Sequence, residues 1–420
     1  MAPGRRLRGA TAATAALVLL AGCAESAADG SGGSGEGVAL GASMEEYQAA
    51  FENVDDIVLY AQSPNAQGSL SGRYIETYHA AVEEWSGGKI TFDVVYASGV
   101  AEPTETDAAL ADGRLDIAQV YPAYAPQRYP ANTALVQSIV ASDASVVEGA
   151  LSANAWPLDL AASNDQILGE FEDNGMKPLA PFYFPGASAL YCTEARTSLS
   201  DLENTVVAAG GASQVAQLEQ IGASPVSIAF SELYEGLQRG VADCALASFN
   251  SAANSGIAEV APNVSLDPQN GFAGMAGAMA MSLDTWESLP LVAQQLLIDR
   301  MDVFWTDYLD VNWEITADAS KQIQEAGGEF FGLDEDARES IGSVNEELLE
   351  EASQAFDDPE DFLSQVADLS TAWDEKVSEL GYENEVDFNG FGEWFEPGRI
   401  DLEPIVSEMF DSIHLESRPE

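Results

Sequence analysis

The run Ile57-Val-Leu-Tyr-Ala61 is short and apolar, which is typical of a buried strand, and the residues after it decide the fold. Residues 74–85 carry apolar side chains on one face of a 3.6-residue period, which predicts a helix. Residues 90–96 alternate as a second strand, residues 106–110 begin a second helix, and residues 115–120 form a third strand. This alternation predicts an α/β sheet with parallel strands.

The same kind of pattern starts again in the middle of the chain. Residues 189–192, 205–209 and 241–247 are typical of strands, and residues 213–221 and 231–239 are typical of helices. Open α/β sheets bind ligands at the carboxyl ends of their strands. We therefore expect an α/β protein of two lobes, with a ligand cleft between them.

The remaining segments extend this two-lobe plan. Residues 291–326 predict a long helix that, at ~1.5 Å per residue, could cross from one lobe to the other. Residues 334–380 are helical in pattern and acidic, whereas Gly and Pro in the last forty residues predict irregular structure. The expected division is lobe I at 45–165 plus 251–290, lobe II at 166–250 plus 291–345, and an acidic C-terminal extension at 346–420.

Composition limits the possible partners. The 420 residues include 46% hydrophobic residues, enough for a sizeable core, but 70 acidic residues against 16 basic ones give a net charge of −54. Nucleic-acid binding is disfavoured because it needs clustered Lys and Arg. The acidic surface is consistent with a soluble exported protein, and adaptation to high salt is an alternative, since salt screens self-repulsion.

The N-terminus predicts export and a lipid anchor. Residues 1–22 combine a basic start with a short apolar stretch, as in a signal peptide, and Leu20-Ala-Gly-Cys23 matches the bacterial lipobox, in which Cys23 is lipidated. Residues 23–37 are rich in Ser and Gly and predict a flexible tether. We expect an extracytoplasmic protein, lipid-anchored to the outer face of the cell membrane; an ordinary secretory signal is the alternative.

Cysteine and histidine usage limits the chemistry. After Cys23, the remaining pair, Cys192 and Cys244, is expected to form a disulfide in an oxidising compartment. The only histidines, His79 and His414, have no metal-ligand or catalytic-triad spacing to the cysteines. No metal, cofactor or enzymatic activity is expected.

Four blocks of sequence resemble a known family, the solute-binding proteins of tripartite ATP-independent periplasmic (TRAP) transporters, dicarboxylate-binding type, here in a lipoprotein form. The blocks are Glu84-Trp-Ser-Gly-Gly-Lys-Ile-Thr-Phe92, Ala111-Asp-Gly-Arg-Leu-Asp-Ile-Ala-Gln-Val-Tyr-Pro-Ala-Tyr124, Gly222-Ala-Ser-Pro-Val-Ser-Ile-Ala-Phe-Ser-Glu-Leu-Tyr-Glu-Gly-Leu-Gln-Arg-Gly-Val-Ala-Asp243 and Met281-Ser-Leu-Asp-Thr-Trp-Glu-Ser-Leu-Pro290. The third is the most specific. The resemblance covers roughly residues 55–335 and implies a two-lobe periplasmic-binding-protein-like fold with a long helix spanning both lobes.

The chain departs from this family where the family binds carboxylates. The family usually has two arginines here, one of which pairs with a substrate carboxylate in two hydrogen bonds. That arginine corresponds to Val207 or Ala208, and the second corresponds to Ser188. Arg73 and Arg128 are the candidates for a relocated clamp. Without one, we expect a neutral, zwitterionic or cationic solute.

The expected ligand contacts follow from strand ends and from the resemblance. Tyr60, Gln62 and Ser63 follow the first strand, and Tyr121 and Tyr124 follow the third. The further candidates are Trp156, Phe184, Ser188, Val207, Phe249 and Asn250.

The resemblance implies a binding protein that captures a small organic solute by lobe closure and delivers it to the integral membrane subunits of a TRAP-type secondary transporter. Two other functions stay open at this point. One is a binding protein of an ATP-driven importer or a sensor, and the other is an exported hydrolase that uses paired carboxylates.

Overall fold

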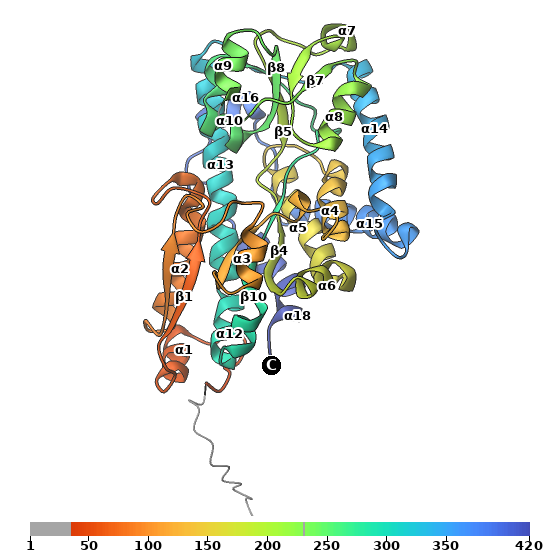
Figure 1. Ribbon diagram of the computed structural model, residues 1–420. Helices are drawn as coiled ribbons and strands as arrows, with labels where there is room; N and C mark the ends of the chain where they lie inside the picture. The colour runs from red at the N-terminus through yellow and green to blue at the C-terminus, as the bar shows by residue number, and fades with distance from the viewer. Residues whose placement is uncertain (1–34, 230–231) are drawn as a thin grey trace, which may run out of the picture. The chain divides into compact units, whose positions relative to one another are not determined.

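The computed structural model describes residues 35–229 and 232–420 (Figure 1). The predicted signal peptide, Cys23 and the tether up to residue 34 lie outside the described residues. No helix in the described part of the chain is long and apolar enough to cross a membrane.

The first sheet contains the opening strands of the chain. Its order is β2-β1-β3-β10-β4, with β1 at Ile57–Gln62, β2 at Ile90–Val95, β3 at Ile117–Val120, β4 at Met176–Tyr183 and β10 at Gly277–Ser282. As predicted, β1 pairs in parallel with β2 and β3. β10 runs antiparallel between β3 and β4, so the sheet is mixed rather than wholly parallel.

The second sheet has the order β11-β9-β5-β8-β6-β7. Its strands are β5 at Ser188–Cys192, β6 at Val206–Ala208, β7 at Ser224–Val226, β8 at Cys244–Ser248, β9 at Asn263–Ser265 and β11 at Phe330–Phe331. β5 and β8 are antiparallel neighbours, and Cys192 lies directly opposite Cys244. The two cysteines form a disulfide, which confirms the predicted pair.

Three segments connect the sheets. Residues 184–187 lead from β4 to β5, and residues 266–276 lead from β9 to β10. Residues 283–329, which are largely helical, lead from β10 to β11. Sheet membership differs from the expected division, because residues 176–183 join the first sheet and residues 263–265 join the second. The complete lobe boundaries stay a prediction.

The predicted long helix is present as two helices. α12 (Leu291–Asp299) and α13 (Met301–Glu325) meet at Arg300, which interrupts the helical geometry. At ~1.5 Å per residue, the 25 residues of α13 extend ~37 Å. α13 packs against α2 (Arg73–Trp85), which covers the first sheet, and against α10 (Phe249–Ser255), which follows β8 (Figure 1). The helix therefore contacts both lobes.

Helices cover the sheets on both sides of these connections. They are α1 (Met44–Phe51), α3 (Thr106–Ala111), α4 (Pro130–Ser138), α5 (Glu148–Ser163), α6 (Asp165–Asp173), α7 (Leu199–Leu202), α8 (Ala212–Gln220), α9 (Leu233–Gln238) and α11 (Leu283–Ser288). The sequence pattern missed α4, α5 and α6. α5 is buried almost all round, so it lacks the polar face that makes a helix recognisable.

The C-terminal region is helical, including the last forty residues, where irregular structure was expected. Its helices are α14 (Glu335–Ser353), α15 (Pro359–Glu379), α16 (Phe388–Trp394), α17 (Glu403–Met409), a π-helical turn at Phe410–His414 and α18 (Leu415–Ser417). The expectation was wrong because Gly390 and Gly392 lie within α16 and Pro404 lies in the first turn of α17, where proline is tolerated. Both short helices bury apolar side chains, among them Phe391 and Ile405. α15 packs on α5, and α16 packs on α13.

Candidate functional site

A cavity of about 250 Å³ lies between the two sheets, where the connecting segments meet α13. Its lining comes from the end of β3, the end of β4, the end of β8 and the middle of α13. The cavity therefore occupies the cleft that the two-lobe pattern predicts.

Tyrosines dominate the wall of this interlobe cavity. The five tyrosines are Tyr74, Tyr121, Tyr124, Tyr183 and Tyr308. The Tyr74 and Tyr308 rings meet edge to face at 4.9 Å between centroids, and those of Tyr183 and Tyr308 meet at 5.2 Å. Phe304, one turn before Tyr308 on α13, is fully buried and stacks on it. Such edge-to-face packing fixes the ring positions.

A buried amide holds two of these tyrosines. The side-chain NH₂ of Gln119, on β3, donates to the hydroxyl of Tyr183 at 2.9 Å and also to that of Tyr74. Burial raises the pKa of Tyr74, and it raises the pKa values of Tyr183 and Tyr308 well above their usual value. The phenols consequently stay protonated and uncharged.

The other polar lining groups are neutral as well. They are Asn65, Ser71, Ser248, Asn250, Ser251 and Asn312. Among the described residues that line the interlobe cavity there is no Lys, Arg, His, Asp or Glu. The site can therefore offer hydrogen bonds and aromatic faces, but no ion pair.

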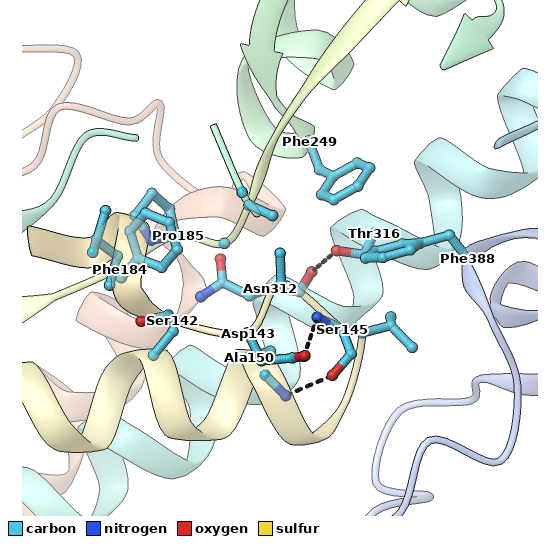
Figure 2. A pocket seen from close by; sticks show the side chains of 18 of the residues that line it. Ser142, Asp143, Ser145, Ala150, Phe184, Pro185, Phe249, Asn312, Thr316 and Phe388 are labelled. Atoms are coloured by element: carbon cyan, nitrogen blue, oxygen red, sulfur yellow. Dashed lines mark hydrogen bonds between the residues drawn. The ribbon is translucent and has the colours of Figure 1, made fainter. Parts of the chain in front are cut away.

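A second, smaller cavity of about 50 Å³ adjoins the first, and Pro185 and Asn312 line both (Figure 2). Its wall is mainly apolar, with Phe184, Phe249 and Phe388 among its side chains. This apolar cavity is much smaller than the ~150 Å³ cavity that admits benzene in an engineered protein. It is too small for an aromatic ring without movement of its walls.

Five of the predicted ligand residues lie at these cavities. Tyr121, Tyr124 and Asn250 line the interlobe cavity, and Phe184 and Phe249 line the apolar cavity. Burial raises the pKa of Tyr121, whereas Tyr124 is half exposed at its position after β3. These placements are consistent with the strand-end rule, and the ligand-binding role of each residue stays a prediction.

The two arginines proposed as a relocated clamp face other partners. Arg73 pairs with three carboxylates of α13, at 2.9 Å to Asp307, 3.0 Å to Asp310 and 2.6 Å to Glu314. Arg128 pairs with Asp107 at 2.7 Å. Neither arginine is among the residues that line the interlobe or the apolar cavity.

Three predicted residues on or after β1 also lie elsewhere. Tyr60 is 56% exposed on the outward side of the strand. The Gln62 side chain is buried, accepts from the N–H groups of Val100 and Ala101, and donates to the Ala101 carbonyl. Ser63 accepts from the backbone of Asn65, which itself lines the cavity. The loop after β1 thus reaches the site through Asn65.

The remaining three predicted residues are buried in structural positions. Trp156 lies on α5, is fully buried, and donates its indole N–H to the hydroxyl of Ser142 at 2.8 Å. Ser188 lies on β5, and Val207 lies on β6 in the core behind the second sheet. None of these three lines either cavity.

The sequence reasoning missed Tyr74, Tyr183, Tyr308 and Asn312. The strand-end rule that selected Tyr121 would also have selected Tyr183, had residues 176–183 been recognised as a strand. Tyr74 and Tyr308 lie on helices, where a tyrosine has the same pattern as a core residue, so the sequence carries no signal for them.

Comparisons with known proteins agree with this geometry. A curated solute-binding protein of Albidiferax ferrireducens is 22% identical over 263 residues, which cover 62% of this chain and 75% of that protein. The structure of a TRAP periplasmic solute-binding protein from Desulfovibrio salexigens matches with a TM-score of 0.62 at 22% identity, covering 79% of this chain and 98% of that one.

Two further solved structures contain ligands. A TRAP periplasmic solute-binding protein from Chromohalobacter salexigens with bound D-glucuronate has a TM-score of 0.60 at 18% identity, covering 75% of this chain and 99% of that one. A marine metagenome TRAP solute-binding protein specific for aromatic acids, in complex with 3-hydroxybenzoate, has a TM-score of 0.61 at 17% identity, covering 78% and 100%. These likenesses establish the two-lobe fold.

The family assignment rests on the sequence itself. The family model of bacterial extracellular solute-binding proteins, family 7, matches residues 61–355, which include the whole of α13 and every strand of both sheets except the first part of β1. The chain belongs to the bacterial extracellular solute-binding proteins of family 7.

Proposed function

We propose that this protein captures a small organic solute in the interlobe cavity and delivers it to the membrane subunits of a TRAP-type transporter. The observation that carries the proposal is the cavity itself, which lies between two sheets joined by three connecting segments. At about 250 Å³ it exceeds the ~150 Å³ of a cavity that admits benzene, so it is large enough for a small metabolite.

Binding would proceed by closure of the two lobes. The connections at residues 184–187 and 266–276, together with α13, are the elements that would bend. A solute that contacts both lobes favours the closed form by its extra contacts there. A ligand-induced decrease in the radius of gyration, measured by solution X-ray scattering, would support this step, and an unchanged radius would contradict it.

The solute is neutral, zwitterionic or cationic. The relatives described above bind D-glucuronate and aromatic acids, whereas no cationic residue is among the described residues that line the cavity of this chain. Val207 and Ser188 stand where the family resemblance implies arginine, and Arg73 and Arg128 are paired with acids elsewhere. A carboxylate in this cavity would lose its hydration without gaining an ion pair, which is unfavourable.

The protein is expected to act from the outer face of the cell membrane, where lipidated Cys23 would hold it near its transporter. Replacing Cys23 by Ser should release the protein from the membrane fraction. An ATPase gene beside this one, in place of genes for a large and a small integral membrane subunit, would instead favour an ATP-driven importer.

A thermal-shift screen tests the proposed function directly. The purified protein would be heated with organic acids, sugars, polyols and amino acids in turn. A ligand at 100 times its dissociation constant stabilises the folded state by about 2.7 kcal/mol, which is easily detected. Calorimetry on any hit, with a Tyr121→Ala variant as comparison, would connect binding to the interlobe cavity.

A further inference from the structure

Unpaired polar atoms gather at the floor of the interlobe cavity. Within the described part of the chain, Oε1 of Gln119, the hydroxyl of Tyr308 and Nδ2 of Asn312 are buried and make no hydrogen bond of standard geometry, although the Asn312 amide interacts with the Tyr308 hydroxyl. Tyr308 and Asn312 line the cavity one helical turn apart on α13, and Gln119 is hydrogen-bonded to the lining residues Tyr74 and Tyr183.

This arrangement is costly for a folded protein. More than about 90% of buried polar groups in proteins are hydrogen-bonded, and leaving one unpaired costs about 1–3 kcal/mol. Tyr308 is 2% exposed and Gln119 is 4% exposed, so water in the open solvent does not reach them freely. Two of these groups, on Tyr308 and Asn312, lie in the cavity wall, and the third lies behind the lining residues Tyr74 and Tyr183, which indicates that a ligand in the cavity completes their hydrogen bonds.

The three atoms specify what that ligand must offer. The Asn312 amide N–H donates, the Gln119 carbonyl accepts, and the Tyr308 hydroxyl can do both. A carboxylate only accepts, a protonated amine only donates, and a quaternary ammonium does neither. A hydroxyl group both donates and accepts, so it can complete all three.

The electrostatics of the cavity favour the same chemistry. Its described lining residues carry no formal charge, and the tyrosine phenols remain protonated because burial raises the pKa of each of Tyr74, Tyr183 and Tyr308. An ion bound here would be desolvated without a counter-charge, which costs far more than desolvating a hydroxyl.

We propose that the solute is an uncharged molecule bearing several hydroxyl groups, and that Tyr308 and Asn312 are its specificity-determining residues, with Gln119 positioning Tyr74 and Tyr183. This inference rests on the proposed function, because it assigns the chemical class of the solute in the same cavity.

The structure offers a matched control. The hydroxyl of Tyr191, on β5, is also buried without a hydrogen-bond partner, but Tyr191 lines neither cavity. Removing an unpaired hydroxyl should not weaken the fold at either position. Tyr308→Phe and Tyr191→Phe should therefore both keep or raise the melting temperature of the unliganded protein, and they should differ only in ligand binding.

The experiment uses the purified protein and three sets of probes in calorimetry: D-glucose, D-mannitol and myo-inositol; choline and glycine betaine; succinate and benzoate. We expect the tightest binding within the first set. Tyr308→Phe and Asn312→Leu should weaken it at least tenfold, and Tyr191→Phe should leave it unchanged. Deoxy analogues of the hit should lose affinity in the wild type and lose less in Tyr308→Phe, because the missing hydroxyl no longer leaves the phenol unpaired.

Other outcomes would overturn the inference. Tightest binding of a cation, a betaine or a carboxylate would show that the class is wrong while the solute-binding function stands. If a polyol binds Tyr308→Phe, Asn312→Leu and the wild type with the same affinity, Tyr308 and Asn312 do not determine specificity. Failure of every probe and of the wider thermal-shift screen would contradict the proposed function as well.

Discussion

Helix α13 presents two faces that differ in charge, although both contact α2. One face holds Arg73 of α2 through three carboxylates, each within 3.0 Å of the guanidinium. The other face carries Tyr308 and Asn312 and lines the neutral interlobe cavity. α13 thus forms ion pairs with α2 through one face and provides an uncharged binding surface with the other.

The difference shows why net charge says little about a binding site. The chain has a net charge of −54, yet no acidic residue is among the described residues that line the interlobe cavity. Arg73, which the sequence offered as a carboxylate clamp, is occupied by Asp307, Asp310 and Glu314. These three acids hold the guanidinium of Arg73 away from the cavity. We therefore expect a solute other than the carboxylates that the family resemblance implies.

The neutral face should be most sensitive to loss of its packing. Phe304 is fully buried and contacts Tyr74, Tyr183 and Tyr308. Phe304→Ala should lower the free energy of unfolding by about 3–5 kcal/mol, the usual cost of removing a buried aromatic ring, and should weaken solute binding as the tyrosines lose their support. Urea unfolding measures the first effect and calorimetry the second.

Phe304→Leu is the matched comparison, because it keeps most of the volume and should cost markedly less. Equal losses in the Ala and Leu variants would mean that ring packing does not organise this face.

The charged face should respond in stability alone. Arg73→Met removes the cation from three carboxylates that lie on successive turns and are 17–27% exposed. We expect a loss of about 2–3 kcal/mol, between the cost of breaking a surface pair and that of breaking a buried one. Arg114→Met, which breaks an exposed pair with Asp112, should cost much less.

Solute affinity of the Arg73→Met protein should equal that of the wild type. A large loss of affinity with little loss of stability would mean that Arg73 binds the solute. Both faces of α13 would then take part in solute binding.

The lobes themselves could be predicted from the sequence, because the strands β1 to β3 alternate with helices of clear periodicity. The mixed strand directions of the first sheet could not be predicted. β4 and β10 come from distant parts of the chain, and no local sequence pattern indicates that they pair. The cavity was predicted through Tyr121 and Tyr124, which directly follow a strand. Its floor was not, because Tyr308 gains its position from the packing of α13 against α2.

A buried histidine next to the neutral face should make stability depend on pH. His414 is 1% exposed and accepts the indole N–H of Trp305, on α13, at 2.8 Å. Burial lowers the pKa of His414 to about 4 from the usual 6.5. Below pH 6.5 the unfolded chain therefore binds a proton that the native protein excludes, and stability falls as the pH falls towards 4.

Between pH 6.5 and 5.5 this single group should cost about 1 kcal/mol. His414→Gln, which can still accept from Trp305, should reduce the pH dependence by that amount. Part of the dependence should persist in the variant, because burial also lowers the pKa of His79, to about 3. An identical pH profile for the variant and the wild type would contradict this account.

The smallest effect on stability is expected from replacing Arg128, the other charged residue that was a candidate for the carboxylate clamp. Arg128 is 46% exposed, and its partner Asp107 also accepts a hydrogen bond from the hydroxyl of Tyr129 at 2.9 Å. Arg128→Ala leaves Asp107, whose side chain is 11% exposed, with that second partner, so we expect a loss below ~1 kcal/mol that shrinks with added salt. Because Arg128 lines neither cavity, solute affinity should stay within twofold of the wild-type value. A loss of affinity greater than tenfold in calorimetry would mean that Arg128 swings into the cleft on closure, and the solute would then have to carry an anionic group.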